Sequence, residues 1–295
     1  MTTPSDSPRP GCPTMPSFGA DSVGQLTYGD YLRVPELLSL QKLRVGGKSH
    51  DELLFIIIHQ TYELWFRQIL HELTTAQLHM RCGQLREATR LVERVNTIGD
   101  LLVDQLDVLA TMRPRDFGHF REALRPASGF QSAQFRELEI ALNMLDPHTL
   151  RFFEEGTIER EAMDLRLKEP NLIDDLIRVF ANHGLDVLNA DLSRKDDEDI
   201  ALAIVPIYRD VEDWRDLYEL CESFTRLDTW ISTWRFRHVR VVERIIGFKS
   251  GTGGSPGVAY LNSTVGRRGC QFLLECRSHL DESELFGAYK PPACE

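Results

Sequence analysis

The sequence lacks long apolar runs and an excess of basic residues. Its longest purely aliphatic and aromatic stretch, Leu53–Ile58, has six residues, far short of the roughly 20 that cross a bilayer. We therefore expect no membrane span. The chain carries 34 Lys and Arg against 45 Asp and Glu, a net charge of −11. Because this charge repels polyphosphate and anionic lipid, we expect no nucleic-acid partner and no membrane partner.

Paired cysteines and a secretory leader are absent as well. The six cysteines include no CxxC pair, so we expect free thiols rather than a zinc knuckle or a disulfide framework. The first residues contain no basic stretch followed by an apolar one, the pattern of a secretory signal. A cytoplasmic location is the resulting prediction.

Both ends of the chain have the composition of loose tails: residues 1–24 are rich in Pro, Ser, Gly and Thr, and the last residues read KPPACE. Over the whole chain of 295 residues, 42% are hydrophobic and 27% charged, which is typical of a soluble globular protein. No linker between the ends could separate two domains. We therefore predict an N-terminal tail over 1–24, a single domain over 25–280 and a C-terminal tail over 281–295.

Helical patterns dominate that domain, and evidence for strands is thin. Ser49 and Glu52 fit a capping box that predicts a helix start, and no Gly or Pro follows until Gly83. The apolar run at 54–58 lies inside this pattern and is predicted helical. Across 84–112, apolar residues recur at the spacing of one buried helix face: Leu91, Val95, Ile98, Leu102, Leu106 and Leu109.

The third long helical region lies between Pro206 and Gly247. Its 40 residues contain no Gly or Pro, so this helical region would reach roughly 60 Å if it were unbroken. Helices of such lengths pack as a bundle. The fold prediction is therefore all-α.

Several metal and phosphate motifs are missing. The chain has no HExxH and no Glu-x-x-His, so the patterns of zinc proteases and di-iron bundles both fail. His59 and Glu63, at i and i+4, could bind a metal only with help from elsewhere. The segment Gly247–Gly257 matches neither a Walker loop nor a dinucleotide loop. It is either a plain turn or an amide-rich loop that could bind an anion, with the Thr252 and Ser255 hydroxyls nearby.

Two histidines and one arginine stand in contexts that leave their roles open. His59 lies in FIIIHQTYELWF and His238 in WRFRHVRVVER. A lone histidine in such a stretch is more often a core residue bonded to a carbonyl than a ligand. A helical protein that holds a haem, however, uses one histidine below the iron and a polar group above it. Arg121, in DFGHFREALRPASGF, could form a surface salt bridge or bind a carboxylate.

Four segments together resemble the tryptophan 2,3-dioxygenase family. They are LTYGDYL at 26–32, HDELLFIIIHQTYELWFRQILHEL at 50–73, DFGHFREALRPASGFQSAQFRELE at 116–139 and WRFRHVRVVERIIGFKSGTGGSPGVAYL at 234–261. Their order and spacing also fit, so the resemblance covers about residues 25–280. One departure follows Leu261, where the family runs into an aromatic, Pro-containing segment and this chain reads GCQFLL at 269–274.

The resemblance implies a fold, a cofactor and a reaction. It implies a bundle of long antiparallel helices that encloses one haem b per subunit of a homotetramer. The implied enzyme is an oxidoreductase that uses O₂ to open the indole C2–C3 bond of L-tryptophan, giving N-formylkynurenine. The alternative is a haem-dependent monooxygenase that makes an oxindole or hydroxylated product from a substituted tryptophan. A haem sensor or scaffold without turnover is a third class, which the predicted carboxylate-binding arginine disfavours.

The resemblance also implies roles for individual residues. His238 matches the proximal haem ligand, and Ser128 and Gly129 match the pair beside the haem. His59 matches the distal histidine that bonds the indole N–H. The residues that match substrate contacts are Phe55, Phe117, Arg121 and Thr252, together with Tyr28, Tyr31 and Leu32, which would reach a neighbouring subunit's pocket.

Overall fold

The structure, a computed structural model, describes residues 26–251 and 257–280. Over these ranges every regular element is a helix, and the only β-bridge is isolated, between Leu188 and Arg194. The predicted all-α class is therefore correct. Contacts divide the chain into two compact units, Met1–Lys42 and Leu43–Glu295. The predicted tails lie outside the described residues, and the single domain over 25–280 stays a prediction.

The first unit contains two short helices, α1 (Tyr28–Leu32) and α2 (Val34–Leu38). The Thr27 side chain caps α1 by accepting a bond from the backbone N–H of Asp30 at 3.2 Å. Arg33 separates the helices with a left-handed backbone (φ 53°). Neither helix has a buried residue, so the described part of this unit, from Leu26 on, shows no apolar core.

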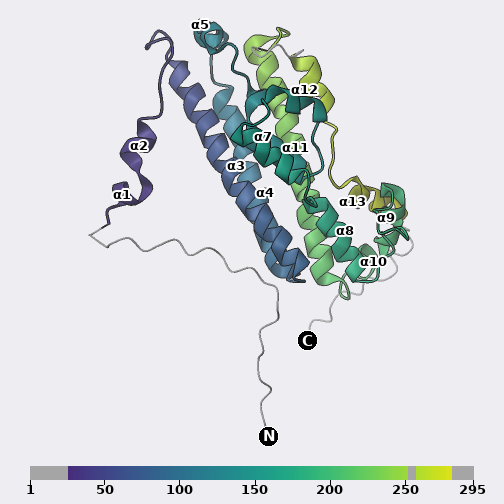
Figure 1. Cartoon of the computed structure of the whole chain (residues 1–295). Coiled ribbons are helices and arrows are strands. Elements are labelled where there is room, and N and C mark those ends of the chain that lie inside the picture. Colours follow the sequence, from purple (N-terminus) through teal and green to yellow (C-terminus); the bar gives the residue numbers. More distant parts are fainter. Residues whose placement is uncertain (1–25, 252–256, 281–295) are drawn as a thin grey trace, which may run out of the picture. The chain divides into compact units, whose positions relative to one another are not determined.

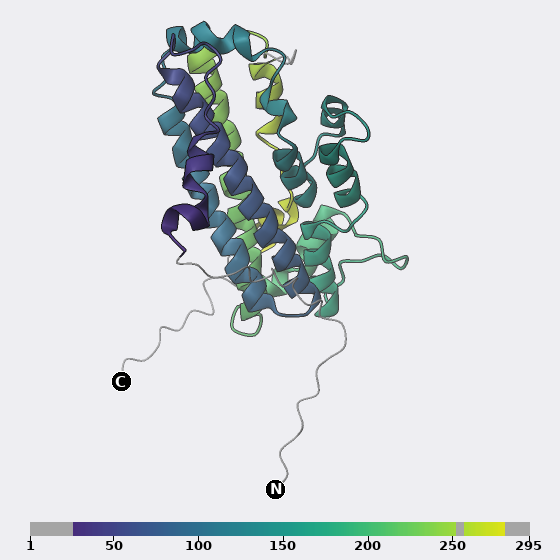
Figure 2. The ribbon, with the colours of Figure 1, turned by 60° about the vertical axis from the view of Figure 1, so that its left-hand side comes forward.

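Three long helices form the frame of the second unit: α3 (Asp51–Arg81), α4 (Leu85–Leu109) and α11 (Arg215–Ile246). They lie side by side in both ribbon views (Figures 1 and 2). Gly83 adopts a positive φ of 71° in the short turn between α3 and α4, so these two helices are antiparallel.

The direction of α11 follows from its contacts with the other two. Ion pairs join α4 and α11 with rising residue numbers on both sides: Arg86–Asp216, Asp100–Arg226 and Asp107–Arg237. These helices are therefore parallel to each other, and α3 is antiparallel to both. The prediction of long antiparallel helices is correct for α3 and wrong for the pair α4 and α11.

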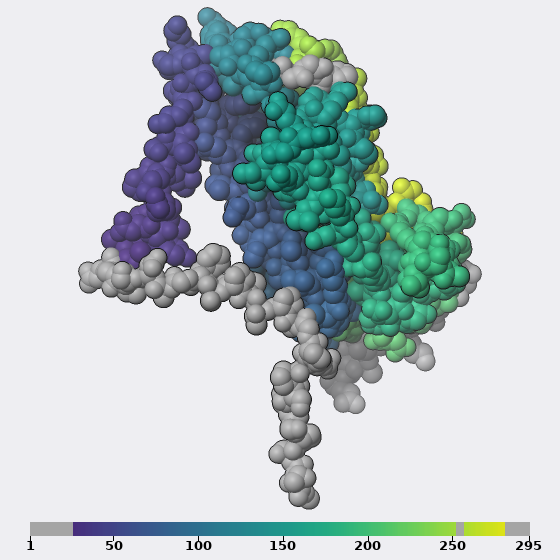
Figure 3. Space-filling view, viewed as in Figure 1, coloured from purple at the N-terminus to yellow at the C-terminus, as the bar shows by residue number. Residues whose placement is uncertain are grey.

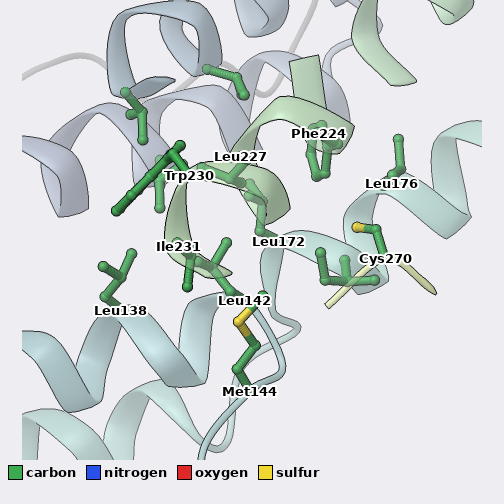
Figure 4. Close-up of a cluster of buried hydrophobic side chains, with 14 of the residues drawn as sticks. Leu138, Leu142, Met144, Leu172, Leu176, Phe224, Leu227, Trp230, Ile231 and Cys270 are labelled. Carbon is green, nitrogen blue, oxygen red and sulfur yellow. The ribbon is translucent and has the colours of Figure 1, made fainter. Parts of the chain in front are cut away.

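Close packing between α4 and α11 depends on Gly99. A Cβ atom at this position would lie 2.3 Å from the indole ring of Trp230, so only glycine allows the helices to approach this closely. The predicted apolar face of α4 is confirmed, since all six of its predicted residues are buried. Figure 4 shows Trp230 with neighbours from α11 beside Leu138 and Leu142 of the α6 region.

Two helix boundaries differ from what the sequence pattern indicates. The region after Pro206 is interrupted, because α10 (Val205–Arg209) ends before α11 begins at Arg215. The capping box is also absent: the Ser49 hydroxyl donates to the carbonyl of Asp116 at 3.0 Å. The Glu52 carboxylate accepts backbone N–H bonds from Arg44 and Val45. Both side chains thus bind segments outside the helix.

Shorter helices pack around this frame. Helix α6 packs against α3 and against α7. In the space-filling view the teal part of the chain lies over the blue part (Figure 3). The remaining helices are α5 (Pro114–Arg121), η1 (Glu122–Leu124), η2 (Gly129–Gln131), α6 (Ala133–Ala141), η3 (Pro147–Phe152), α7 (Ile158–Arg166), α8 (Leu172–Asn182), α9 (Asp197–Ala203), α12 (Val258–Thr264), α13 (Gln271–Glu275) and η4 (Cys276–His279).

Most of the 269–274 segment and three of the four described cysteines, Cys221, Cys270 and Cys276, are buried. The Asp228 carboxylate accepts backbone N–H bonds from Gly269 and Cys270, and Phe272 and Leu273 are buried. Each of the four described cysteines is a free thiol, as expected. Burial raises the pKa of Cys276 to about 11, so this thiol is not a reactive thiolate at neutral pH. Among the helices described, none is both long and apolar enough to span a membrane.

Candidate functional site

Helix α3 contributes one wall of the candidate site through Phe55 and His59. Their rings lie one helical turn apart, with centroids 4.0 Å from each other. The Nδ1 atom of His59 lies 2.7 Å from the carbonyl oxygen of Phe55. Because a carbonyl can only accept, Nδ1 carries the proton and donates. The Nε2 atom of the neutral ring is therefore an acceptor.

The surroundings of His59 favour its neutral form. The side chain is exposed, yet desolvation by the surrounding protein lowers its pKa below the usual 6.5. The bond to the Phe55 carbonyl and the charge of Glu63 oppose this shift in part. The ring is therefore mainly neutral and still accessible to solvent. At neutral pH such a ring can accept a hydrogen bond from a ligand.

Helix α11 contributes the opposite histidine, His238. Burial, followed by the nearby charge of His59, lowers the pKa of His238 to about 4. The effect of His59 indicates that the two imidazoles, from separate helices, lie close to each other. No hydrogen bond to either ring nitrogen of His238 is found in the described part of the chain, and the side chain is only partly buried. A neutral imidazole with an uncommitted nitrogen is suited to bind a metal.

Helix α5 adds an aromatic cluster and a guanidinium to the His59 wall. The Phe55 ring lies 5.8 Å from Phe117 and 5.4 Å from Phe120, measured between centroids. The Arg121 side chain is only 12% exposed, and its Nη2 donates to the carbonyl of Ser250 at 2.6 Å. Its one ion pair, with Glu122, is long at 3.4 Å. Arg121 is thus neither a free surface cation nor a strongly paired one.

The turn at Ser128 and Gly129 approaches α3 through the residues that follow it. The Ser128 hydroxyl caps η2, accepting a bond from the backbone N–H of Phe130. Glu63, one turn beyond His59, accepts bonds from Ser132 at 2.6 Å and from Gln134 at 2.9 Å. A Cβ atom built on Gly129 would meet nothing within 4 Å. The turn therefore leaves open space beside its backbone.

Four predicted site residues are not placed with this group. Thr252 lies outside the described residues, although the adjoining Ser250 contacts Arg121. Tyr28, Tyr31 and Leu32 are exposed residues of the first unit. The roles predicted for these four residues stay predictions.

Three residues near the histidines were not expected from the sequence. Trp234 stacks on His238, and its Nε1 donates to the Tyr62 hydroxyl at 3.3 Å. Phe120 joins Phe55 and Phe117 and is fully buried. Helical spacing placed Trp234 one turn before His238 and Phe120 three residues after Phe117, and this spacing was the only signal available.

Other features of the surface do not compete with the histidines as a site. An open cleft of about 780 Å³ is lined by Arg44, Val45, Gly46, Lys48 and His119. It contains none of the predicted site residues, and its charged side chains are exposed. Over the residues that the structure describes, no group of three or more His, Cys, Asp and Glu side chains could hold a metal ion. Any metal held by His238 would need further ligands from a cofactor.

Comparisons with known proteins identify similar chains over nearly the whole length. The family model described as tryptophan 2,3-dioxygenase matches residues 17–170 and 182–279. The tryptophan 2,3-dioxygenase of Nocardioides sp. is 43% identical over 269 residues, which cover 90% of this chain and 98% of that protein. The enzyme of that name from Bacillus thuringiensis (strain Al Hakam) is 40% identical over 261 residues, covering 86% and 93%. That of Caulobacter vibrioides is 41% identical over 261 residues, covering 86% and 98%.

Proposed function

The chain belongs to the tryptophan 2,3-dioxygenase family, and from this premise we propose that His59 and His238 are the centre of its active site. The protein is an oxidoreductase that uses O₂ and haem to oxidise L-tryptophan, opening the indole C2–C3 bond to give N-formylkynurenine. The observation that carries the site assignment is the pair of neutral imidazoles, one with a free acceptor and the other with an uncommitted nitrogen.

The residues present fit haem b. Where a macrocycle supplies four ligands to iron, one protein histidine suffices as the axial ligand, and His238 is neutral with no hydrogen-bond partner in the described ranges. Gly129 has open space beside it, where a cofactor edge could lie. The Nε of buried Arg136 has no partner among the described groups and could bind an anionic propionate. When bound, haem would supply the iron that binds and activates O₂.

His59 and its aromatic neighbours account for recognition of the indole. An indole is apolar except for one N–H, so its pocket needs apolar walls and a single acceptor. The Nε2 of His59 is that acceptor, because Nδ1 is committed to the Phe55 carbonyl. Phe55, Phe117 and Phe120 form the apolar wall and exclude water from the reacting ring.

Arg121 accounts for recognition of the amino-acid end. A zwitterionic substrate needs a cation for its carboxylate, and a guanidinium can bind a carboxylate through two parallel bonds. Arg121 is poorly paired and mostly shielded from solvent, which strengthens such a bond. Its contact with Ser250 also ties it to the segment that carries Thr252, for which we keep the predicted role beside the substrate ammonium.

A homotetramer in the cytoplasm completes the proposal. Leu53, Ile57 and Leu64 share one face of α3, and each is more than 40% exposed. Exposed apolar stripes of this kind are typical of subunit interfaces. Tyr28 and Tyr31, 78% and 72% exposed, are likewise available to contact a neighbouring subunit.

Isotope labelling of the product tests the function. The purified holoenzyme is given L-tryptophan under ¹⁸O₂, with reductant only to prime the iron, and the product is analysed by mass spectrometry. We expect N-formylkynurenine with two labelled oxygen atoms. A singly labelled hydroxylated or oxindole product, or turnover only of a substituted tryptophan, would instead establish the monooxygenase.

A further inference from the structure

The indole of Trp234 lies flat against the imidazole of His238. The ring centroids are 5.0 Å apart and the planes differ by 15°. Every other aromatic pair in the described ranges is tilted by more than 30°. Both residues lie on α11 at i and i+4, the spacing that brings side chains together on a helix. The stack therefore limits how the imidazole can rotate.

Three other helices hold Trp234 in place. Its Nε1 donates to the Tyr62 hydroxyl of α3 at 3.3 Å, and that hydroxyl donates to the Leu102 carbonyl of α4 at 2.7 Å. The Phe135 ring of α6 packs against the indole with centroids 5.1 Å apart. The indole is thus fixed by partners that do not belong to α11. The positions of these partners therefore determine where the indole lies against His238.

His238 lacks the hydrogen bond that orients two other histidines of the chain, His59 on α3 and His183 at the C-terminal end of α8. The Nδ1 atoms of His59 and His183 each bond to the carbonyl four residues earlier, at 2.7 and 2.8 Å. Across the described residues His238 has no such bond. A metal-binding histidine is usually oriented by a hydrogen bond from its second nitrogen. At His238 the stacked indole of Trp234 takes the place of that hydrogen bond in orienting the imidazole.

We propose that Trp234 and Tyr62 are positioning residues that set the rotation of the His238 imidazole by stacking instead of by a hydrogen bond. The inference rests on the proposed role of His238 as axial ligand. Tyr62 acts through Trp234, and neither residue contacts the substrate. Because no carboxylate or carbonyl within 26–251 or 257–280 accepts from the imidazole, we expect the ligand to keep the character of a neutral imidazole and to gain none of an imidazolate.

Resonance Raman spectroscopy of the ferrous holoenzyme tests the stack through the iron–histidine stretching band. Trp234→Leu removes the stacked ring, so we expect a shifted and broadened band and haem binding weakened about 10-fold. Trp234→Phe keeps an aromatic ring and should retain a single band close to the parent's. Tyr62→Phe removes only the hydroxyl that holds the indole, so we expect broadening without a loss of haem.

A matched control comes from Trp230, one turn earlier on α11, which packs on Gly99 and not on His238. Trp230→Leu should lower stability and leave the band unchanged. The proposal is overturned if Trp234→Leu leaves the band and haem affinity unchanged, or if Trp230→Leu alters them equally. Should Trp234→Leu fail to fold, an unchanged band in Tyr62→Phe overturns the proposal and a broadened one supports it.

Failure of the axial assignment would look different. His238→Ala should abolish the iron–histidine band. If that variant keeps the band, the proposed role of His238 itself is wrong. If the band is lost there but unaffected by Trp234→Leu and Tyr62→Phe, only the stacking inference fails.

Discussion

The two walls of the site use the same residue type for different purposes. On α3, His59 is tied to the Phe55 carbonyl through Nδ1, which leaves an acceptor at Nε2. On α11, His238 has an aromatic neighbour in place of a hydrogen bond. Burial lowers the pKa of both rings, so both are neutral at pH 7. The difference is that one ring nitrogen of His59 is engaged in a hydrogen bond, whereas neither nitrogen of His238 has a hydrogen-bond partner among the described residues.

This difference shows how surroundings assign a role to a histidine. A fixed tautomer makes His59 a hydrogen-bond acceptor for an N–H group, a role in substrate recognition. An uncommitted, neutral nitrogen suits His238 to the metal-ligand role that we propose for it. The local sequence does not distinguish these roles, because each histidine lies in an apolar helical segment.

Replacing each histidine by alanine should have unequal effects, and this is the largest effect that we expect. His238→Ala should fold and lose its haem, because no other axial ligand is provided at that wall. His59→Ala should keep its haem and lose activity. The measurements are haem content per subunit and the ferrous–CO spectrum.

His183→Ala is the control for that comparison. This histidine is exposed at the end of α8 and bonds to the Val179 carbonyl, so its loss should leave the haem content unchanged. A full haem complement and an unchanged ferrous–CO spectrum in His238→Ala would refute the assignment of the two walls.

Substitution of Arg121 tests whether the side of the site that contains His59 also binds the substrate carboxylate. A charge-assisted bond to a carboxylate contributes about 1.5–3 kcal/mol, so Arg121→Ala should lower kcat/KM roughly 10- to 150-fold. Arg121→Lys should rescue little, because an ammonium lacks the planar fork. The haem spectrum should stay that of the parent. Parent-like steady-state kinetics in Arg121→Ala would assign the residue a purely structural role at Ser250.

Much of the fold could be predicted from periodicity, and the exceptions lie at helix boundaries. The face of α4 from Leu91 to Leu109 is buried as expected, because burial of one helix side imposes the 3.6-residue period. Ser49 failed as a cap because its hydroxyl binds Asp116, 67 residues away. The break before Arg215 has no Gly or Pro to mark it. A tertiary contact explains the first case; at the second, the backbone N–H groups of Asp213 and Trp214 both bond to the Asp210 carbonyl in a local turn.

The site was predictable as a set of residues and not as an arrangement. His59, His238 and Arg121 were each identified, chiefly through the family resemblance. Their roles stay proposals, and the sequence alone did not predict long-range contacts such as Arg121 to Ser250. The stack on His238 and its tether to Tyr62 join residues 172 positions apart, and no local pattern marks such a contact.

Gly99→Ala tests how closely α4 packs against α11, the helix that carries His238. Its Cβ would lie 2.3 Å from the Trp230 indole, one turn before Trp234. Overpacking of this kind lowers stability by about 1–3 kcal/mol. Over most of that range the loss is larger than the roughly 1 kcal/mol that alanine gains over glycine in a helix. We expect a lower free energy of unfolding in urea. Gly118→Ala is the control, since its Cβ would meet nothing within 4 Å; equal stability changes would mean that α4 and α11 do not pack this closely.

The smallest expected effect is a difference in pH dependence between apoprotein and holoenzyme. The pKa of His238 is about 4 in the folded chain against an ordinary 6.5, so the unfolded chain binds more protons between these values. Stability of the apoprotein should therefore fall as the pH falls through this window, by at most about 1.4 kcal/mol per pH unit for this one group. His59 adds a contribution of the same sign, because its pKa is lowered too.

His238→Phe isolates the share of His238, since it keeps a ring against Trp234 and removes the titrating group. Urea unfolding between pH 6.5 and 5, above the range where most carboxylates titrate, should show a shallower slope for the apoprotein of this variant than for the parent apoprotein. In the parent holoenzyme the nitrogen is held by iron, so protons must compete with the metal and the curve should drop later as the pH falls. Equal slopes for the two apoproteins would show that the pKa of His238 is not lowered. His238 would then titrate like an ordinary exposed histidine.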